Sequence, residues 1–142
     1  MTANYYTRNV MFEGKSILIV DDDPSLLEMY VERIKAEGAI VLEAIDGEAA
    51  IRSVKQNHPA AILLDIMMPK LNGFEVLKNL KSDAEMAQIP VIILTALADD
   101  QKRQQGLALG AADFIVKSET LPVDVIEKLR KIIAPNTPNS EI

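Results

Sequence analysis

Polar residues that could do chemistry follow directly after short apolar stretches of this 142-residue chain. They are Asp21, Asp22 and Asp23 after the first stretch, Asp65 after the third, Thr95 after the fourth and Lys117 after the fifth. Carboxylates crowded at one place repel one another, so a folded chain needs a positive charge among them. Because no His or Cys lies near them in the sequence, oxygen would supply all ligands, which favours Mg²⁺, with Mn²⁺ as a substitute.

A lysine and a threonine beside such carboxylates indicate phosphate chemistry. The Lys117 ammonium could hold one phosphoryl oxygen, and the Thr95 hydroxyl could donate a hydrogen bond to another. Asp65 could then attack phosphorus and form an acyl phosphate, while the metal and the lysine stabilise the charge of the transferring group. These residues therefore predict phosphoryl transfer to a carboxylate.

The elements that must position these residues can be predicted from hydrophobic patterning. Apolar runs predict strands over residues 16–20, 39–44, 60–64, 90–94 and 113–116. Helical spacing of apolar residues predicts helices over residues 24–37, 46–56, 71–80, 99–109 and 121–133. The first, third and fourth strands are apolar throughout, so helices should cover both faces of a parallel sheet. We expect an open, doubly wound α/β sandwich of three layers, in which ligands bind beyond the carboxyl ends of the strands.

Composition narrows the classes of function. Hydrophobic residues make up 49% and charged residues 25%, which is enough for one core and excludes intrinsic disorder. The net charge of −6 argues against direct binding to nucleic acid or to anionic membranes. With no cysteine, no apolar run long enough to span a membrane and no signal peptide, we expect a cytoplasmic protein.

Four motifs also resemble a known family. Over roughly residues 15–134, ILIVDDDP, LLDIMMPKLNG, VIILTA and ADFIVK are similar to the receiver domain of bacterial two-component response regulators. The resemblance implies a flavodoxin-like sheet with strand order 2-1-3-4-5 and five helices. It also implies Mg²⁺-dependent phosphoryl transfer from a histidine kinase or a histidine phosphotransfer protein. Such a chain would be a signalling phosphoacceptor with self-catalysed phosphorylation and dephosphorylation rather than an enzyme.

The resemblance assigns roles to single residues. Asp65 would be the phosphoacceptor and would bind the metal directly together with Asp22. Asp21 would bind the metal through water, and the backbone carbonyl of Met67 would add a further ligand.

The remaining site residues would bind the phosphoryl group and pass the signal on. Thr95 and Lys117 would hold the phosphoryl group, and Thr95 with Phe114 would form a switch pair. The family commonly has a cis proline after the lysine, but here Ser118 follows, and a cis bond before serine costs ~2.5–4 kcal/mol, so we expect trans. Phe114 lacks the hydroxyl of the usual tyrosine, so its inward orientation needs no polar partner and should be favoured.

We expect three segments: an N-terminal extension over residues 1–14, the receiver domain over 15–134 and a flexible tail over 135–142. Because the residues after 133 are too few to fold, the sequence predicts a stand-alone regulator. Phosphorylation would then change a face over residues 99–133 that binds an effector protein or a second copy of the chain.

Two alternatives from other classes remain. Asp21, Asp23 and Ser25 superficially match the nucleophile motif of haloacid-dehalogenase-like phosphatases, which would make the chain an enzyme acting on small phosphate esters. Against this, no acidic pair follows Lys117 on a later strand, and a cap domain does not fit in this length. The other alternative is a pseudo-receiver, an interaction module that is insensitive to phosphate.

Overall fold

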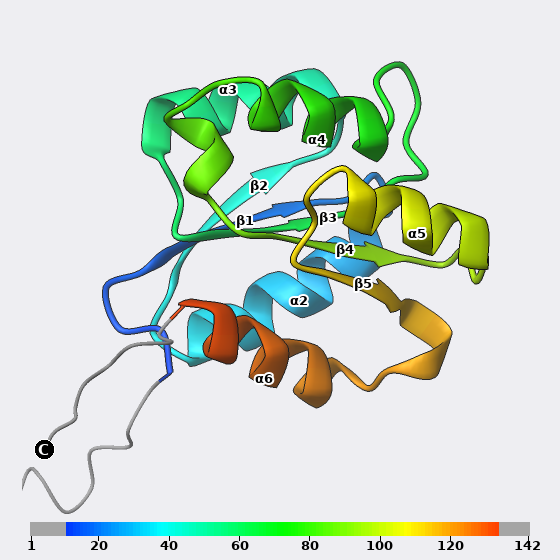
Figure 1. Ribbon diagram of the computed structural model, residues 1–142. Helices are drawn as coiled ribbons and strands as arrows, with labels where there is room; N and C mark the ends of the chain where they lie inside the picture. The colour runs from blue at the N-terminus through cyan, green and yellow to red at the C-terminus, as the bar shows by residue number, and fades with distance from the viewer. Residues whose placement is uncertain (1–10, 134–142) are drawn as a thin grey trace, which may run out of the picture.

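The structure is a computed structural model that describes residues 11–133 (Figure 1). Its centre is a sheet of five parallel strands in the order β2-β1-β3-β4-β5, which confirms the predicted order. The strands are β1 (Ser16–Val20), β2 (Ile40–Ala44), β3 (Ala61–Leu64), β4 (Val91–Thr95) and β5 (Asp113–Val116). Three of them begin one residue later than predicted, which is a small correction.

Helices cover both faces of this sheet, as predicted. The helices among the described residues are α2 (Pro24–Ala36), α3 (Gly47–Asn57), α4 (Gly73–Lys81), α5 (Asp100–Ala108) and α6 (Pro122–Ile133). Figure 1 shows α2 and α6 below the sheet and α3 and α4 above it. Between them lies a hydrophobic core in two clusters, one on each face. The continuous burial of β3 and β4 follows from this double cover, because both faces of each strand contact helices.

Capping side chains set where the helices begin. Asn72 and Glu75 form a capping box, so α4 begins at Gly73, two residues later than the apolar pattern predicts. Asp23 caps α2 and Asp99 caps α5, because each side chain accepts hydrogen bonds from backbone N–H groups of the first turn. Two short 3-10 helices, η1 (Met86–Gln88) and η2 (Lys117–Glu119), were not predicted.

The N-terminal extension expected over residues 1–14 is described only from residue 11, and the tail expected over 135–142 lies outside the described residues. Phe12, within that extension, has no exposed surface and belongs to the core cluster that includes residues of α2 and α6. Its N–H also donates to the carbonyl of Glu37 at 2.8 Å. Hydrophobic periodicity does not predict this contact, because Phe12 lies in a turn outside the predicted strands and helices.

The helices on the upper face differ in how firmly they pack. Five residues of α4 are buried, whereas Gly106 is the one buried residue of α5.

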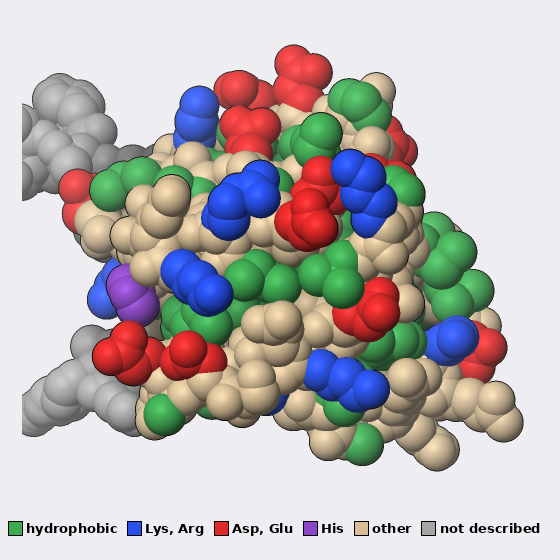
Figure 2. All heavy atoms as spheres, turned by 90° about the horizontal axis from the view of Figure 1, so that it is seen from above, with side chains coloured by type: hydrophobic (Ala, Val, Ile, Leu, Met, Phe, Trp, Pro, Cys, Tyr) green, Lys and Arg blue, Asp and Glu red, His purple; other side chains and the backbone are tan. Residues whose placement is uncertain are grey.

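The face seen in Figure 2 carries Lys and Arg interspersed with Asp and Glu, with hydrophobic side chains between them. Within residues 11–133, no helix has the length and apolar character needed to cross a membrane.

Candidate functional site

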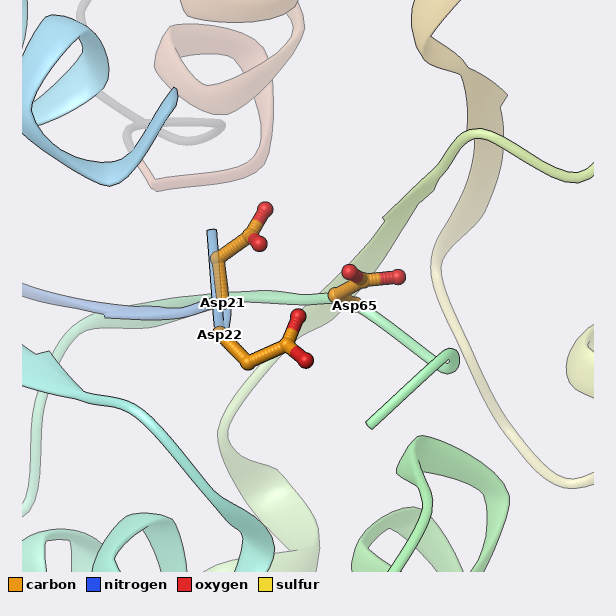
Figure 3. Close-up of side chains that lie close together, drawn as sticks. All are labelled: Asp21, Asp22 and Asp65. Carbon is orange, nitrogen blue, oxygen red and sulfur yellow. The ribbon is translucent and has the colours of Figure 1, made fainter. Parts of the chain in front are cut away.

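Three of the predicted carboxylates meet at the carboxyl edge of the sheet. β1 and β3 are adjacent, and each is followed directly by an aspartate, Asp21 and Asp65. The backbone N–H of Asp65 donates to the carbonyl of Val20 at 3.0 Å, which continues the pairing of the two strands up to the site. Asp22 joins them, and one carboxylate oxygen from each of the three lies within 4.8 Å of the others (Figure 3).

The third residue of the acidic run has a different place. Asp23 is exposed and caps α2, so it does not belong to this cluster. Its backbone N–H donates to Asp21 Oδ1 at 2.9 Å, which fixes the orientation of the Asp21 carboxylate. Asp21 is only 4% exposed, whereas Asp22 is exposed to solvent. The run therefore supplies one buried carboxylate, one exposed carboxylate and one helix cap.

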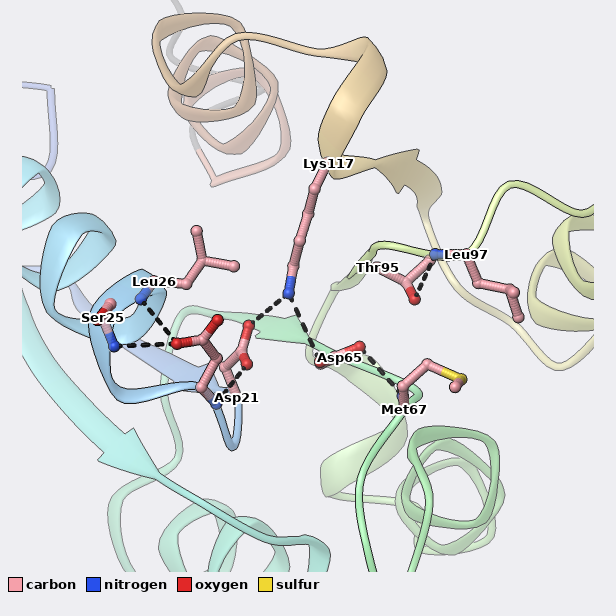
Figure 4. Close-up of polar contacts among 9 residues, drawn as sticks. Asp21, Ser25, Leu26, Asp65, Met67, Thr95, Leu97 and Lys117 are labelled. Atoms are coloured by element: carbon pink, nitrogen blue, oxygen red, sulfur yellow. Dashed lines mark hydrogen bonds and ion pairs between the residues drawn. The ribbon is translucent and has the colours of Figure 1, made fainter.

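Lys117 brings a positive charge between the two buried carboxylates. It follows β5, and its Nζ lies 2.8 Å from Asp21 Oδ2 and 3.6 Å from Asp65 Oδ2 (Figure 4). The shorter of these contacts is also a hydrogen bond. Among residues 11–133 there is no cis peptide bond, so the bond between Lys117 and Ser118 is trans, as predicted. The Lys117 side chain thus reaches the site with a trans bond after it.

Asp65, like Asp21, is almost completely buried. It is 5% exposed, and its Oδ1 accepts a hydrogen bond from the backbone N–H of Met67 at 3.0 Å. Burial raises the pKa of Asp65 above its ordinary value, and Asp21 and Asp22 raise it further. The Met67 hydrogen bond and the Lys117 ammonium lower this pKa but do not cancel the rise. Ionised Asp65 is therefore incompletely compensated by the protein, and a cation beside it would reduce the cost.

The donor set fits a hard divalent cation. Asp21, Asp22 and Asp65 offer carboxylate oxygens only, which suits Mg²⁺ or Mn²⁺. The backbone N–H of Met67 donates a hydrogen bond to Asp65. The role of the Met67 carbonyl as a metal ligand stays a prediction.

Thr95 lies on β4, which neighbours β3, and Phe114 lies on β5, the next strand beyond it. Thr95 ends β4 and is fully buried, and its Oγ1 accepts a hydrogen bond from the N–H of Leu97 at 3.2 Å (Figure 4). In the register of β4 and β5, Thr95 is opposite Val116 and Phe114 is opposite Ile93. The Phe114 ring is 2% exposed and so has the inward orientation that the sequence favours.

Sequence reasoning missed two features around these residues. A cleft of about 380 Å³ opens beside Asp22, with Met67, Leu97, Phe74 and Lys102 among its lining residues. Arg103 contacts Phe114, through a hydrogen bond to the Phe114 carbonyl and through its place over the ring. No motif predicts either feature, because both depend on how α5 packs against the sheet.

The fold and the site together define a class: doubly wound α/β proteins with an acidic pocket at the carboxyl edge of the sheet. The chain belongs to the response regulator receiver domain family, whose model matches residues 17–130. Members of this family are signalling phosphoacceptors that bind Mg²⁺ at an acidic pocket, and the cluster of Asp21, Asp22 and Asp65 could hold such a metal.

Individual relatives agree with this assignment. The chain is 37% identical over 138 residues to a probable transcriptional regulator ycf27 of Porphyridium aerugineum, a match that covers 92% of this chain and 56% of the relative. It is 39% identical over 118 residues to the DNA-binding dual master transcriptional regulator RpaA of Synechocystis, covering 83% of this chain and 47% of the relative. The chain therefore spans about half the length of these curated relatives.

A solved structure has the same fold. The receiver domain of the Francisella response regulator 1452 superposes with a TM-score of 0.80 at 27% identity, covering 87% of this chain and all of that domain. The similarity confirms the predicted fold class.

Proposed function

We propose that this domain accepts a phosphoryl group on Asp65 from the phosphohistidine of a histidine kinase or of a histidine phosphotransfer protein. An oxygen of the Asp65 carboxylate attacks phosphorus, the bond between phosphorus and the imidazole nitrogen breaks, and the imidazole leaves. The observation that carries this proposal is the arrangement around Asp65. One oxygen is held by the Met67 N–H, and the other lies 3.6 Å from the Lys117 ammonium.

Asp22 and Asp65 would bind Mg²⁺ directly, Asp21 through water, and the Met67 carbonyl would complete the protein ligands. The close approach of three carboxylate oxygens, all within 4.8 Å, supports this assignment. Mg²⁺, when bound, would offset the charge of the carboxylates and of the transferring phosphoryl oxygens, and Mn²⁺ suits the same donors.

Lys117 and Thr95 would hold the phosphoryl oxygens. Lys117 is only partly exposed and already lies between two carboxylates. Its ammonium would therefore need to move only a short distance to bind a phosphoryl group on Asp65. Thr95 Oγ1 accepts from the Leu97 N–H, which leaves its own O–H proton as a donor. Thr95 and Phe114 would then act as the switch pair.

The phosphatase alternative has less support. It would use Asp21 and Asp23 as nucleophile and acid, but the Asp23 carboxylate caps α2 by accepting from Ser25 and Leu26 N–H groups. A phosphate-insensitive module would not need Lys117 held between two buried carboxylates, an arrangement that favours the phosphoacceptor.

Phosphorylation would change the face formed by residues 99–133, which include α5, β5 and α6. An effector protein, or a second copy of the chain, would bind this face. The net charge of −6 favours a protein partner over direct contact with nucleic acid.

Two substrates distinguish the alternatives. With acetyl phosphate and Mg²⁺, we expect one phosphoryl group per chain and no sustained turnover of p-nitrophenyl phosphate. Sustained release of p-nitrophenol would support the phosphatase, and neither labelling nor turnover would support the phosphate-insensitive module.

A further inference from the structure

The Phe114 ring lies between β4 and α5, and Gly106 supplies the space for it. A Cβ atom built on Gly106 would lie 2.7 Å from Ile93 Cδ1 and 3.2 Å from Phe114 Cδ2. A side chain at this position would therefore displace the end of the Ile93 side chain and press on the packed ring, which would have to shift by a few tenths of an ångström. Glycine is unfavourable in a helix interior, so this residue weakens α5 locally while leaving room for the ring.

Arg103, one helical turn before Gly106, holds the same phenylalanine at two points. Its guanidinium lies over the Phe114 ring at 5.3 Å from the centroid, which is within the range of a cation–π contact. Its Nη1 donates to the Phe114 carbonyl at 3.0 Å. The remaining contacts of α5 with the sheet are few, since Gly106 is its one buried residue. The docking of α5 thus depends strongly on Phe114.

A cavity beside the Phe114 ring offers space for a second, outward orientation of the ring. This cavity, of about 240 Å³, is lined by Arg103 and Phe114 together with Asp99, Asp100 and Glu119. An outward turn of the ring would remove it from the notch at Gly106 and break its contact with the Arg103 guanidinium. The backbone hydrogen bond alone would then hold Arg103 to β5.

We propose that Arg103 and Gly106 are positioning residues that hold the Phe114 ring inward and couple its orientation to the docking of α5. Gly106 provides the space and Arg103 provides the attraction. The consequence for signalling rests on the proposed function: a partner that binds α5 would sense the ring, and phosphorylation of Asp65 would act on a ring already biased inward.

The Ile93 δ1-methyl group can report the ring directly. It lies in the same notch as the Phe114 ring, so an inward ring should shift its NMR resonance by the ring current. Arg103→Met removes the guanidinium but keeps an apolar stem. We expect it to lower the ratio of inward to outward ring about two- to fivefold, the size of one cation–π contact, because the hydrogen bond to the Phe114 carbonyl is made in both orientations. The Ile93 signal should move correspondingly away from its ring-shifted position.

Three further variants complete the test. Arg103→Lys keeps a cation and should recover part of the ring-current shift, whereas loss of general packing would not be rescued in this way. Lys102→Met is the matched control, because Lys102 lies over the Phe74 ring at 5.8 Å rather than over Phe114. Because the Phe74 ring also borders the notch at Gly106, Lys102→Met should move the Ile93 signal less than Arg103→Met does. Gly106→Ala should press on the ring and on the Ile93 methyl group and so change the ring-current shift, with folding checked by thermal melting.

An Ile93 signal unchanged in Arg103→Met, or shifted equally by Lys102→Met, would overturn the role of Arg103. An unchanged ring-current shift in folded Gly106→Ala would overturn the role of Gly106. These readouts need no phosphate, so they are independent of the proposed function. The Ile93 signals of the variants could differ from one another and yet not respond to beryllofluoride with Mg²⁺. In that case the proposed function would fail and the positioning role would stand.

Discussion

Asp22 is the carboxylate whose charge the protein compensates least. Lys117 contacts Asp21 and Asp65, but no lysine or arginine within residues 11–133 lies at ion-pair distance from Asp22. The Asp22 oxygen lies within 4.8 Å of an oxygen of Asp21 and of Asp65, and two like charges at the upper end of that range repel by about 1 kcal/mol in water. Because Asp22 is exposed, screening reduces this repulsion, and we take about 1–2 kcal/mol for the pair of interactions.

Replacing this charge should therefore stabilise the metal-free protein. We expect Asp22→Asn to melt roughly 3–8 °C higher than the wild type in EDTA. Mg²⁺ at ten times its Kd should stabilise the wild type by about 1.4 kcal/mol, and Asp22→Asn should lose most of this response because it lacks a ligand. Differential scanning fluorimetry with EDTA and with a Mg²⁺ series measures both effects.

Asp23→Asn is the matched control for this experiment. It removes the same charge one residue away, and asparagine caps a helix as well as aspartate does. We expect it to retain the full Mg²⁺ response. A wild-type melting curve indifferent to both EDTA and Mg²⁺, or equal Mg²⁺ responses of the two variants, would refute the assignment of Asp22 as a ligand.

Three other substitutions test the core and the buried charges. Phe12→Ala should destabilise the protein by about 3–5 kcal/mol in urea unfolding, because the ring is fully buried, whereas a Met11→Ala control that loses nearly as much would contradict a specific role. Lys117→Met should cost about 3–5 kcal/mol, since it leaves Asp21 and Asp65 buried without a cation; an unchanged urea midpoint would show that the ion pairs contribute nothing. The raised pKa of Asp65 makes the folded protein bind a proton more readily than the unfolded chain, so this group lowers stability as pH rises through its folded pKa. Asp65→Asn should accordingly be more stable than the wild type at neutral pH, with an advantage that disappears as the pH approaches the ordinary carboxyl pKa, and a pH-independent difference would contradict this cause.

The sequence predicts the sheet and its carboxyl edge well, for a physical reason. Strands buried on both faces appear as continuous apolar runs, and chemically active residues follow them at one edge, so periodicity and position carry most of the information. The convergence of Asp21, Asp65 and Lys117 could be predicted in this way. That Asp22 joins the cluster while Asp23 leaves it to cap α2 could not be derived from composition or spacing, because adjacent aspartates differ only in local backbone direction.

Contacts between distant segments account for what the sequence does not predict. The burial of Phe12 depends on the end of α2, which brings Glu37 to its backbone. The contacts of Arg103 and Gly106 with Phe114 depend on the docking of α5, a helix with little amphipathic pattern and one buried residue. Such features need the packed structure, since neither a motif nor a periodic pattern marks the residues involved.

The most direct test of the account is to locate the phosphoryl group chemically. After incubation with acetyl phosphate and Mg²⁺, intact-mass spectrometry should detect one added phosphoryl group per chain. Borohydride reduction of the acyl phosphate, followed by peptide mapping, should place the modified residue at Asp65, and Asp65→Asn should take up no label under the same conditions. Labelling of Asp65→Asn at the wild-type rate, or a modified residue elsewhere in the chain, would contradict the central claim that Asp65 is the phosphoacceptor.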